Sequence, residues 1–192
     1  MRTSTKERRT KETNIKLTLN LDGTGKAEID TGVGFFDHML TSFAVHSRFD
    51  LSVKCTGDTG VDAHHSVEDV GIVLGKAFAE AIGDKTGVAR YGNFGVPMDE
   101  ALATCHIDVS GRAYTVLDAP FTAERIGELD TQMIPEFFRA FANNAGVTVH
   151  LRVHYGENDH HNAEALFKAF AHALCIAVSL TGDDLLTTKG VL

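Results

Sequence analysis

Hydrophobic side chains recur along this chain with two different periods. A period of about 3.6 residues runs through residues 67–81 and again through 163–177, which predicts two amphipathic helices. Shorter helices are predicted over 38–44 and 136–142. Runs rich in β-branched residues, separated by turn residues, predict strands between these helices. The predicted strands are 14–21, 26–30 and 49–53, then 101–109, 112–117 and 147–153.

The two halves of the chain repeat one order of elements. Each long helix begins at an H-H-x-x-E motif, first at His64 and again, 96 residues further on, at His160. Each half therefore reads β-β-α-β-α, over about 1–90 and 91–192, and the glycine-rich stretch 83–95 joins them. We predict an α+β protein that forms one compact unit by internal duplication, with helices covering one face of each sheet.

The composition excludes several classes of protein. Hydrophobic residues make up 43% of the chain, which suits a well-formed core. No apolar run approaches the ~20 residues of a membrane span and no signal-peptide pattern is present, so we expect a cytoplasmic protein. The net charge of −8 argues against nucleic-acid binding. Cys55, Cys105 and Cys175 lie too far apart in sequence to suggest a disulfide framework or a thiolate metal site.

Histidine is the unusual residue type, since two adjacent pairs hold four of the 10 histidines. In a helix, His64 and Glu68 lie about 40° apart around the axis, and His65 and Glu68 about 60° apart on the other side. Each motif thus offers its ligands to two neighbouring metal sites. Imidazole and carboxylate ligands without thiolate suit a divalent ion such as Mn, Fe, Co or Zn. The repeat also places His38 and Glu136 at equivalent positions, as further candidate ligands.

Histidines and glycine motifs of these kinds also occur without a functional role. A single histidine near a helix start is usually a surface or capping residue, but two pairs with the same glutamate spacing are difficult to explain in that way. The sequence Gly71-x-x-x-Gly75-Lys76 matches only part of a nucleotide-binding loop motif. We discount it because it lies inside a predicted helix.

Several motifs, in order, resemble the imidazoleglycerol-phosphate dehydratase family over nearly the whole chain. They are T-G-V-G-F-F-D-H-M-L at 31–40, D-A-H-H-S-V-E-D at 62–69, P-M-D-E-A at 97–101, S-G-R at 110–112, G-E-N-D-H-H at 156–161 and T-K-G-V-L at 188–192. The resemblance implies the ribosomal protein S5 domain 2-like fold. It also implies a lyase of histidine biosynthesis, which converts D-erythro-imidazoleglycerol 3-phosphate to imidazoleacetol phosphate and water.

The resemblance further implies two Mn²⁺ ions in each active site, acting as Lewis acids. One ion would be held by His38, His64, Glu68 and His160, and the other by His65, Glu136, His161 and Glu164. Some family members carry histidine where this chain has Glu136. The family assembles as a homo-oligomer of 24 subunits with its active sites at subunit interfaces, so the same is expected here.

Family matching also points to residues that contact the substrate. Glu12 is the expected proton-transfer residue, and His46 and Asp99 are further possibilities for proton transfer or for orienting a ligand. The phosphate group of the substrate would be held by cations and one hydroxyl group. These residues are Arg90, Arg112, Lys168, Thr187 and Lys189.

Two other functions fit the residue types. A binuclear metallohydrolase could use the same ligands and would release no new ketone. A non-catalytic metal-binding assembly would bind metal without turnover.

Overall fold

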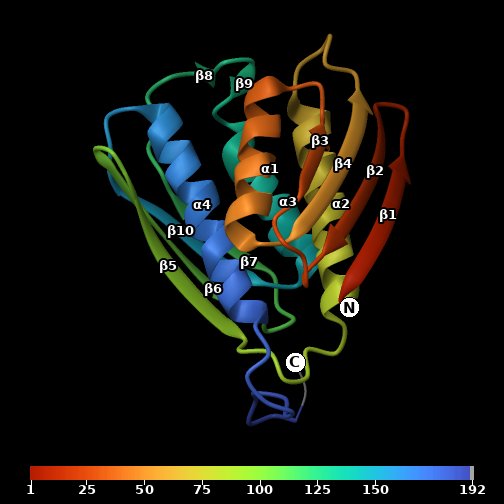
Figure 1. Ribbon diagram of the computed structural model, residues 1–192. Coiled ribbons are helices and arrows are strands. Elements are labelled where there is room, and N and C mark those ends of the chain that lie inside the picture. The colour runs from red at the N-terminus through yellow and green to blue at the C-terminus, as the bar shows by residue number, and fades with distance from the viewer. Residues whose placement is uncertain (191–192) are drawn as a thin grey trace.

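Two four-stranded sheets enclose a layer of four helices (Figure 1). The structure is a computed structural model and describes residues 1–190, so the end of the last family motif, Val191 and Leu192, lies outside the described residues. None of the helices in residues 1–190 combines the length and hydrophobicity that a membrane span requires.

The first half of the chain builds one sheet and two helices. Its strands stand in the order β1-β2-β4-β3, where β3 runs parallel to β4 and the other neighbours are antiparallel. In chain order the elements are β1 (Thr3–Arg9), β2 (Thr13–Asn20), β3 (Ala27–Asp30), α1 (Gly34–Ser47), β4 (Asp50–Gly57) and α2 (His64–Ile82).

The second half repeats this arrangement, with the sheet order β5-β6-β10-β7. A two-stranded hairpin, β8 and β9, is inserted before the third helix. The elements are β5 (Tyr91–Met98), β6 (Ala101–Asp108), β7 (Tyr114–Asp118), β8 (Arg125–Ile126), β9 (Leu129–Asp130), α3 (Met133–Ala145), β10 (Thr148–Tyr155) and α4 (Asp159–Val178).

The predicted fold class is confirmed, and each half gains one edge strand that the pattern did not predict. β1 reads TSTKERR and buries only Ser4, so it lacks a hydrophobic stripe. β5 contains Gly92, Gly95 and Pro97, which weaken a strand prediction but are tolerated at a sheet edge. The stretch 83–95, which we predicted to be a connection, therefore includes the beginning of β5.

Two helix pairs, each with one helix from either half, hold the two halves together. α1 packs on α4 and α2 packs on α3, so the first half contacts the second through both pairs. Buried phenylalanines fill these contacts, with ring centroids 5.5 Å apart for Phe43 and Phe170 and 5.6 Å apart for Phe78 and Phe141. The duplicated helices thus share one hydrophobic core.

Gly71 and Gly75 allow α2 and α3 to approach closely. A Cβ atom at Gly71 would lie 2.9 Å from the carbonyl oxygen of Phe137, and one at Gly75 would lie 2.5 Å from that of Phe141. These distances are shorter than ordinary contacts, so the two glycines serve helix packing and not nucleotide binding.

The turns that begin α2 and α4 share one kind of hydrogen bond, although only α4 has a side-chain cap. The Asn158 side chain accepts hydrogen bonds from the backbone N–H groups of His160 (2.9 Å) and His161 (3.4 Å), which caps α4. The Asp62 side chain accepts one from His64 at 2.7 Å. The two histidine pairs therefore stand at well-defined helix starts.

Candidate functional site

His38, His160 and Glu164 meet at the start of α4. Their ligand atoms all lie within 4.8 Å of one another, and within residues 1–190 they form the one such group of three or more metal-ligating side chains. Glu164 Oε2 lies 3.3 Å from His38 Nε2 and 3.2 Å from His160 Nε2. Because α1 packs on α4, a histidine of the first half joins two residues of the second.

Lys168, one of the predicted phosphate-binding residues, lies beside this group. Its Nζ lies 2.8 Å from Glu164 Oε1, one helical turn away. Glu164 is 7% exposed, and burial alone would raise its pKa. The hydrogen bond and charge of Lys168, together with His38, outweigh burial and lower the pKa of Glu164, so its carboxylate is available as a ligand.

A related set of residues lies where α2 packs on α3. His64 Nε2 is 3.7 Å from Glu68 Oε2, the same i to i+4 pairing that His160 makes with Glu164. Glu136 occupies the first turn of α3 and forms an ion pair with Arg139. The next residue, Phe137, contacts α2 at Gly71, so the first turn of α3 lies beside α2. Within residues 1–190, Glu136 does not converge with His64 and Glu68 as His38 does with His160 and Glu164.

The second histidine of each pair has a different kind of partner. His65 Nδ1 lies 3.1 Å from both carboxylate oxygens of Asp58, and its Nε2 lies 3.8 Å from Glu12. The hydrogen bond to Asp58 raises the pKa of His65. Glu12 is placed in the turn between β1 and β2, next to Thr13, whose hydroxyl donates to the buried Asp69 at 2.5 Å.

In the second half, His161 Nδ1 lies 2.7 Å from Glu100, and His161 Nε2 lies 3.8 Å from Asp99. The hydrogen bond from His161, with that from the backbone of Asn158, lowers the pKa of Glu100 to about 2. The hydrogen bond to Glu100 raises the pKa of His161. Sequence reasoning missed Asp58 and Glu100, although Glu100 lies inside the P-M-D-E-A motif.

Four of the predicted phosphate-binding residues share one cavity at the other end of α4. It has a volume of about 730 Å³ and is lined by Arg90, Arg112, Thr187 and Lys189, among others. Arg90 donates to Asp108 at 2.8 Å and to the carbonyl of Leu186 at 2.7 Å, which ties the chain after α4 to the start of β5. The cavity thus gathers three cationic side chains, with Asp183 and Asp184 also in its lining.

His46 lies on the last turn of α1, between the group formed by His38, His160 and Glu164 and the cavity lined by Arg90. Its Nδ1 is 3.1 Å from His172 Nε2 on α4, and the His172 ring stacks on Phe94 with centroids 4.3 Å apart. Burial, followed by the charges of His172 and Lys168, lowers the pKa of His46. The imidazole of His46 is therefore kept neutral.

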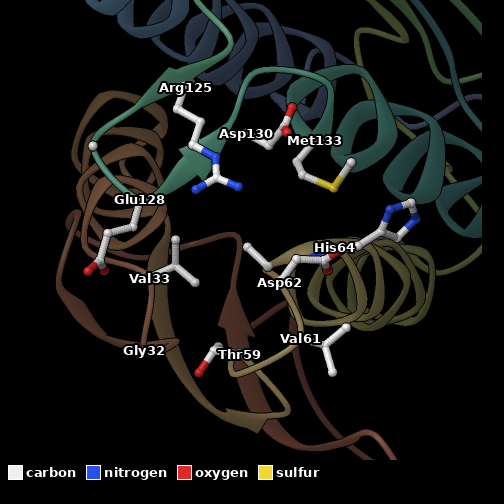
Figure 2. Close-up of a pocket in the computed structure, with 12 residues that line it drawn as sticks. Gly32, Val33, Thr59, Val61, Asp62, His64, Arg125, Glu128, Asp130 and Met133 are labelled. Carbon is white, nitrogen blue, oxygen red and sulfur yellow. The ribbon is translucent and has the colours of Figure 1, made fainter.

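A second cavity, of about 540 Å³, adjoins the start of α2 (Figure 2). Figure 2 shows Arg125 and Glu128 of the β8–β9 hairpin on one side of it and Asp62 and His64 on the other. Arg125 also lines a shallower hollow with His160 and His161. The hairpin therefore stands between the two H-H-x-x-E helix starts.

The group of His38, His160 and Glu164 and the cavity lined by Arg90 are far apart within one chain. The backbone N–H of Arg90 donates to Ala177 near the end of α4, whereas His160 is in its first turn. With a rise of about 1.5 Å per residue, these positions are ~25 Å apart. A small phosphorylated molecule cannot reach both within a single chain.

Comparisons with known proteins agree with this arrangement of elements. Residues 31–174 match the family model described as "Imidazoleglycerol-phosphate dehydratase". The chain is 56% identical over 192 residues to a protein of that name from Methanosarcina barkeri, with both chains covered completely. It is 54% identical over 186 residues to one from Clostridioides difficile, and 97% of each chain is covered.

Solved structures extend the comparison to the fold. The crystal structure of the enzyme of that name from Staphylococcus aureus is 41% identical, with a TM-score of 0.85 over 93% of this chain and 99% of that one. The structure from Pyrococcus furiosus, in complex with (S)-C348, is 36% identical and also has a TM-score of 0.85, over 97% of this chain and 100% of that one.

Proposed function

This chain belongs to the imidazoleglycerol-phosphate dehydratase family and is an enzyme of histidine biosynthesis, and on that premise we propose that it works with two Mn²⁺ ions at sites shared between copies of the chain. Its reaction converts D-erythro-imidazoleglycerol 3-phosphate to imidazoleacetol phosphate and water. The residues described above supply the ligands, the cationic phosphate site and the proton-transfer group.

The donor set supports a hard divalent ion. His38, His160 and Glu164 would hold one ion, since two imidazoles and a buried carboxylate already converge there without a thiolate. His64, Glu68 and Glu136 would hold the second, by the pseudo-symmetry of the two halves. This proposal divides the ligands differently from the family resemblance, because Glu164 lies with His38 and His160. When bound, such an ion acts as a Lewis acid on the substrate. His65 and His161 are assigned to the remaining coordination positions.

The cationic cavity supports binding of the phosphate group. Arg112 and Lys189 line it with Arg90, and Thr187 offers a hydroxyl group. Arginine and lysine hold a phosphate by charge-assisted hydrogen bonds, which anchor the end of the substrate that does not react. Lys168 instead lies beside Glu164, so it would act near the metal residues.

The separation of ~25 Å between these sites supports an assembly of several chains. If one substrate molecule contacts both sites, the phosphate-binding residues and the metal ligands must come from different copies. We propose the homo-oligomer of 24 subunits that the family resemblance implies, with active sites at subunit interfaces. Turnover would then depend on assembly as well as on metal.

Glu12 is the proposed proton-transfer residue. Its carboxylate lies 3.8 Å from His65 Nε2, at the tip of a turn tied to α2 by Asp69 and Thr13. A carboxylate beside the proposed metal site can accept a proton from the substrate and return it to another atom.

The convergence of His38, His160 and Glu164 is the observation that carries this proposal. The test is to remove metal with a chelator, measure imidazoleacetol phosphate formation, and then add Mn²⁺. We expect activity to disappear and return with Mn²⁺. His160→Asn should abolish turnover, whereas His150→Asn, at an exposed position on β10, should not.

Other outcomes would refute the proposal. Turnover that persists after chelation would exclude the metal mechanism. Loss of phosphate without a ketone product would identify a metallohydrolase, and metal binding without any product would identify a storage or structural assembly.

A further inference from the structure

Two carboxylates outside the ligand set hold the second histidine of each pair by the same ring atom. We propose that Asp58 and Glu100 are positioning residues, which orient His65 and His161 so that each presents Nε2 to a metal ion. The inference rests on the proposed function, because it concerns the same metal sites.

In the first half, Asp58 lies in the loop between β4 and α2. Both of its carboxylate oxygens are 3.1 Å from His65 Nδ1. The backbone of the same residue donates to the carbonyl of Glu12 at 3.1 Å. Asp58 therefore fixes the imidazole ring relative to the turn that carries the proposed proton-transfer residue.

In the second half, the carboxylate comes from a different element. Glu100 lies in the turn between β5 and β6, and its Oε2 is 2.7 Å from His161 Nδ1. Its Oε1 accepts hydrogen bonds from the backbone N–H groups of Asn158 (2.8 Å) and Glu157 (3.2 Å). One side chain thus holds both the histidine ring and the loop that leads into α4.

The carboxylate that contacts Nδ1 of the second histidine comes from a different structural element in each half. Asp58 precedes α2 in the chain, whereas Glu100 comes from a hairpin that packs beside α4. Direct copying of a single position in the duplication does not produce this pattern. Since both carboxylates contact Nδ1 of the second histidine, the common requirement is the orientation of that ring.

The chemistry of imidazole explains the requirement. A neutral ring that donates Nδ1–H to a carboxylate carries its free electron pair on Nε2, which is the atom that can bind metal. Nε2 of His65 and Nε2 of His161 each lie 3.8 Å from the nearest carboxylate, beyond hydrogen-bond distance. Both rings therefore present an available Nε2.

Glu100→Gln tests this idea with little change in shape. The two backbone N–H groups require an oxygen at their end of the side chain, so the glutamine NH₂ must face His161. His161 Nδ1 would then accept that hydrogen bond, and its proton would move to Nε2. The loop contacts remain, but the metal-binding atom is blocked.

Asp58→Asn provides a contrasting case. Both oxygens of Asp58 face His65 Nδ1, so asparagine can still place its oxygen there. The hydrogen bond and the ring tautomer are kept, and only the charge is lost. Asp58→Ala removes the hydrogen bond altogether.

The experiment measures Mn²⁺ affinity by electron paramagnetic resonance titration, and the melting temperature of the metal-free protein. We expect Glu100→Gln and Asp58→Ala to raise the Kd for Mn²⁺ about 10- to 100-fold, and Asp58→Asn to raise it much less. Glu100→Gln keeps the two loop hydrogen bonds and should remain folded, with a melting temperature a few degrees below that of the wild type because the stabilising charge is lost. Glu157→Gln, which removes a charge from the same loop, is the control and should leave the Kd within about twofold.

Distinct results would overturn the inference. If Glu100→Gln binds Mn²⁺ like the wild type while Glu100→Ala does not, Glu100 only supports the loop. If Asp58→Ala binds normally, Asp58 has no positioning role. If the wild type itself binds no Mn²⁺, the metal sites and this inference both fail, whereas metal-independent turnover by a Mn²⁺-binding protein would refute only the proposed function.

Discussion

The turn that carries Glu12 is held against α2 by one buried carboxylate, that of Asp69. Replacing this carboxylate is the sharpest test of how the fold positions the site. Asp69 is 7% exposed and accepts hydrogen bonds from Arg8 Nε at 2.9 Å and from the Thr13 hydroxyl at 2.5 Å. Thr13 adjoins Glu12, so the change Asp69→Asn acts directly on the turn.

The expected size of the effect follows from these contacts. Hydrogen bonds to a charged group contribute about 1.5–3 kcal/mol, and asparagine loses the charge and one of the two acceptor oxygens. The Arg8 side chain is 35% exposed, so solvent reduces the electrostatic part. We expect Asp69→Asn to lower the free energy of unfolding by about 2 kcal/mol, which is ~4–8 °C in melting temperature for a chain of this size.

The same variant should also lose activity at temperatures where it is folded. A displacement of about 1 Å in a reacting group can cost ~100-fold in rate. We therefore expect kcat to fall by ~10- to 100-fold while KM changes little, because the phosphate-binding residues lie at the other end of α4. Thermal unfolding of the metal-free protein and steady-state kinetics of the Mn²⁺-loaded protein measure the two effects.

The exposed pair Glu7–Lys16 on the same sheet provides the control. Its side chains are 69% and 68% exposed, so Glu7→Gln should change stability by less than ~1 kcal/mol and leave kcat unchanged. An Asp69→Asn variant that behaves like Glu7→Gln in both assays would refute the claim that Asp69 holds the turn.

Three further predictions concern packing, substrate binding and pH. Gly75→Ala should lower the free energy of unfolding by about 1–2 kcal/mol, because the new Cβ would lie 2.5 Å from the Phe141 carbonyl oxygen. Gly34→Ala is the control, since the space around Gly34 is open. Equal melting temperatures for the two variants would contradict the packing argument. Arg112→Ala should raise KM ~10- to 100-fold in steady-state assays with little change in kcat, and an unchanged KM would remove it from the phosphate site. The pKa of Glu100 is lowered from 4.5 to about 2, so the stability it contributes is present above pH 4.5 and is lost as the pH falls toward 2. In acid unfolding curves, Glu100→Gln should remove that part of the pH dependence, and parallel curves would show that Glu100 does not contribute.

Much of the fold was predictable from local patterns. The helical period over 67–81 and 163–177 corresponds to α2 and α4, and the repeat of H-H-x-x-E correctly indicated two related halves. These signals are readable because an amphipathic helix places its own apolar residues on one face, whatever it packs against. The strands β1 and β5 were missed because edge strands bury little side-chain surface.

The candidate site divides in the same way. The histidine pairs, Glu68 and Glu164 follow from spacing along a helix, which is a local property. That His38 and not Glu136 lies beside His160 depends on the packing of α1 against α4, which no local pattern specifies. The roles of Asp58 and Glu100 depend likewise on loops meeting across the fold.

The sequence by itself determined the duplicated helices, their candidate histidine and glutamate ligands and the family, since each of these depends on residue type and short-range spacing. Only the tertiary structure decided which helix faces which, which carboxylate holds each ring, and that the cationic cavity lies ~25 Å from the metal residues. Those facts arise from contacts between residues distant in the chain, where side-chain volumes such as those of Gly71 and Gly75 determine how closely two helices can approach.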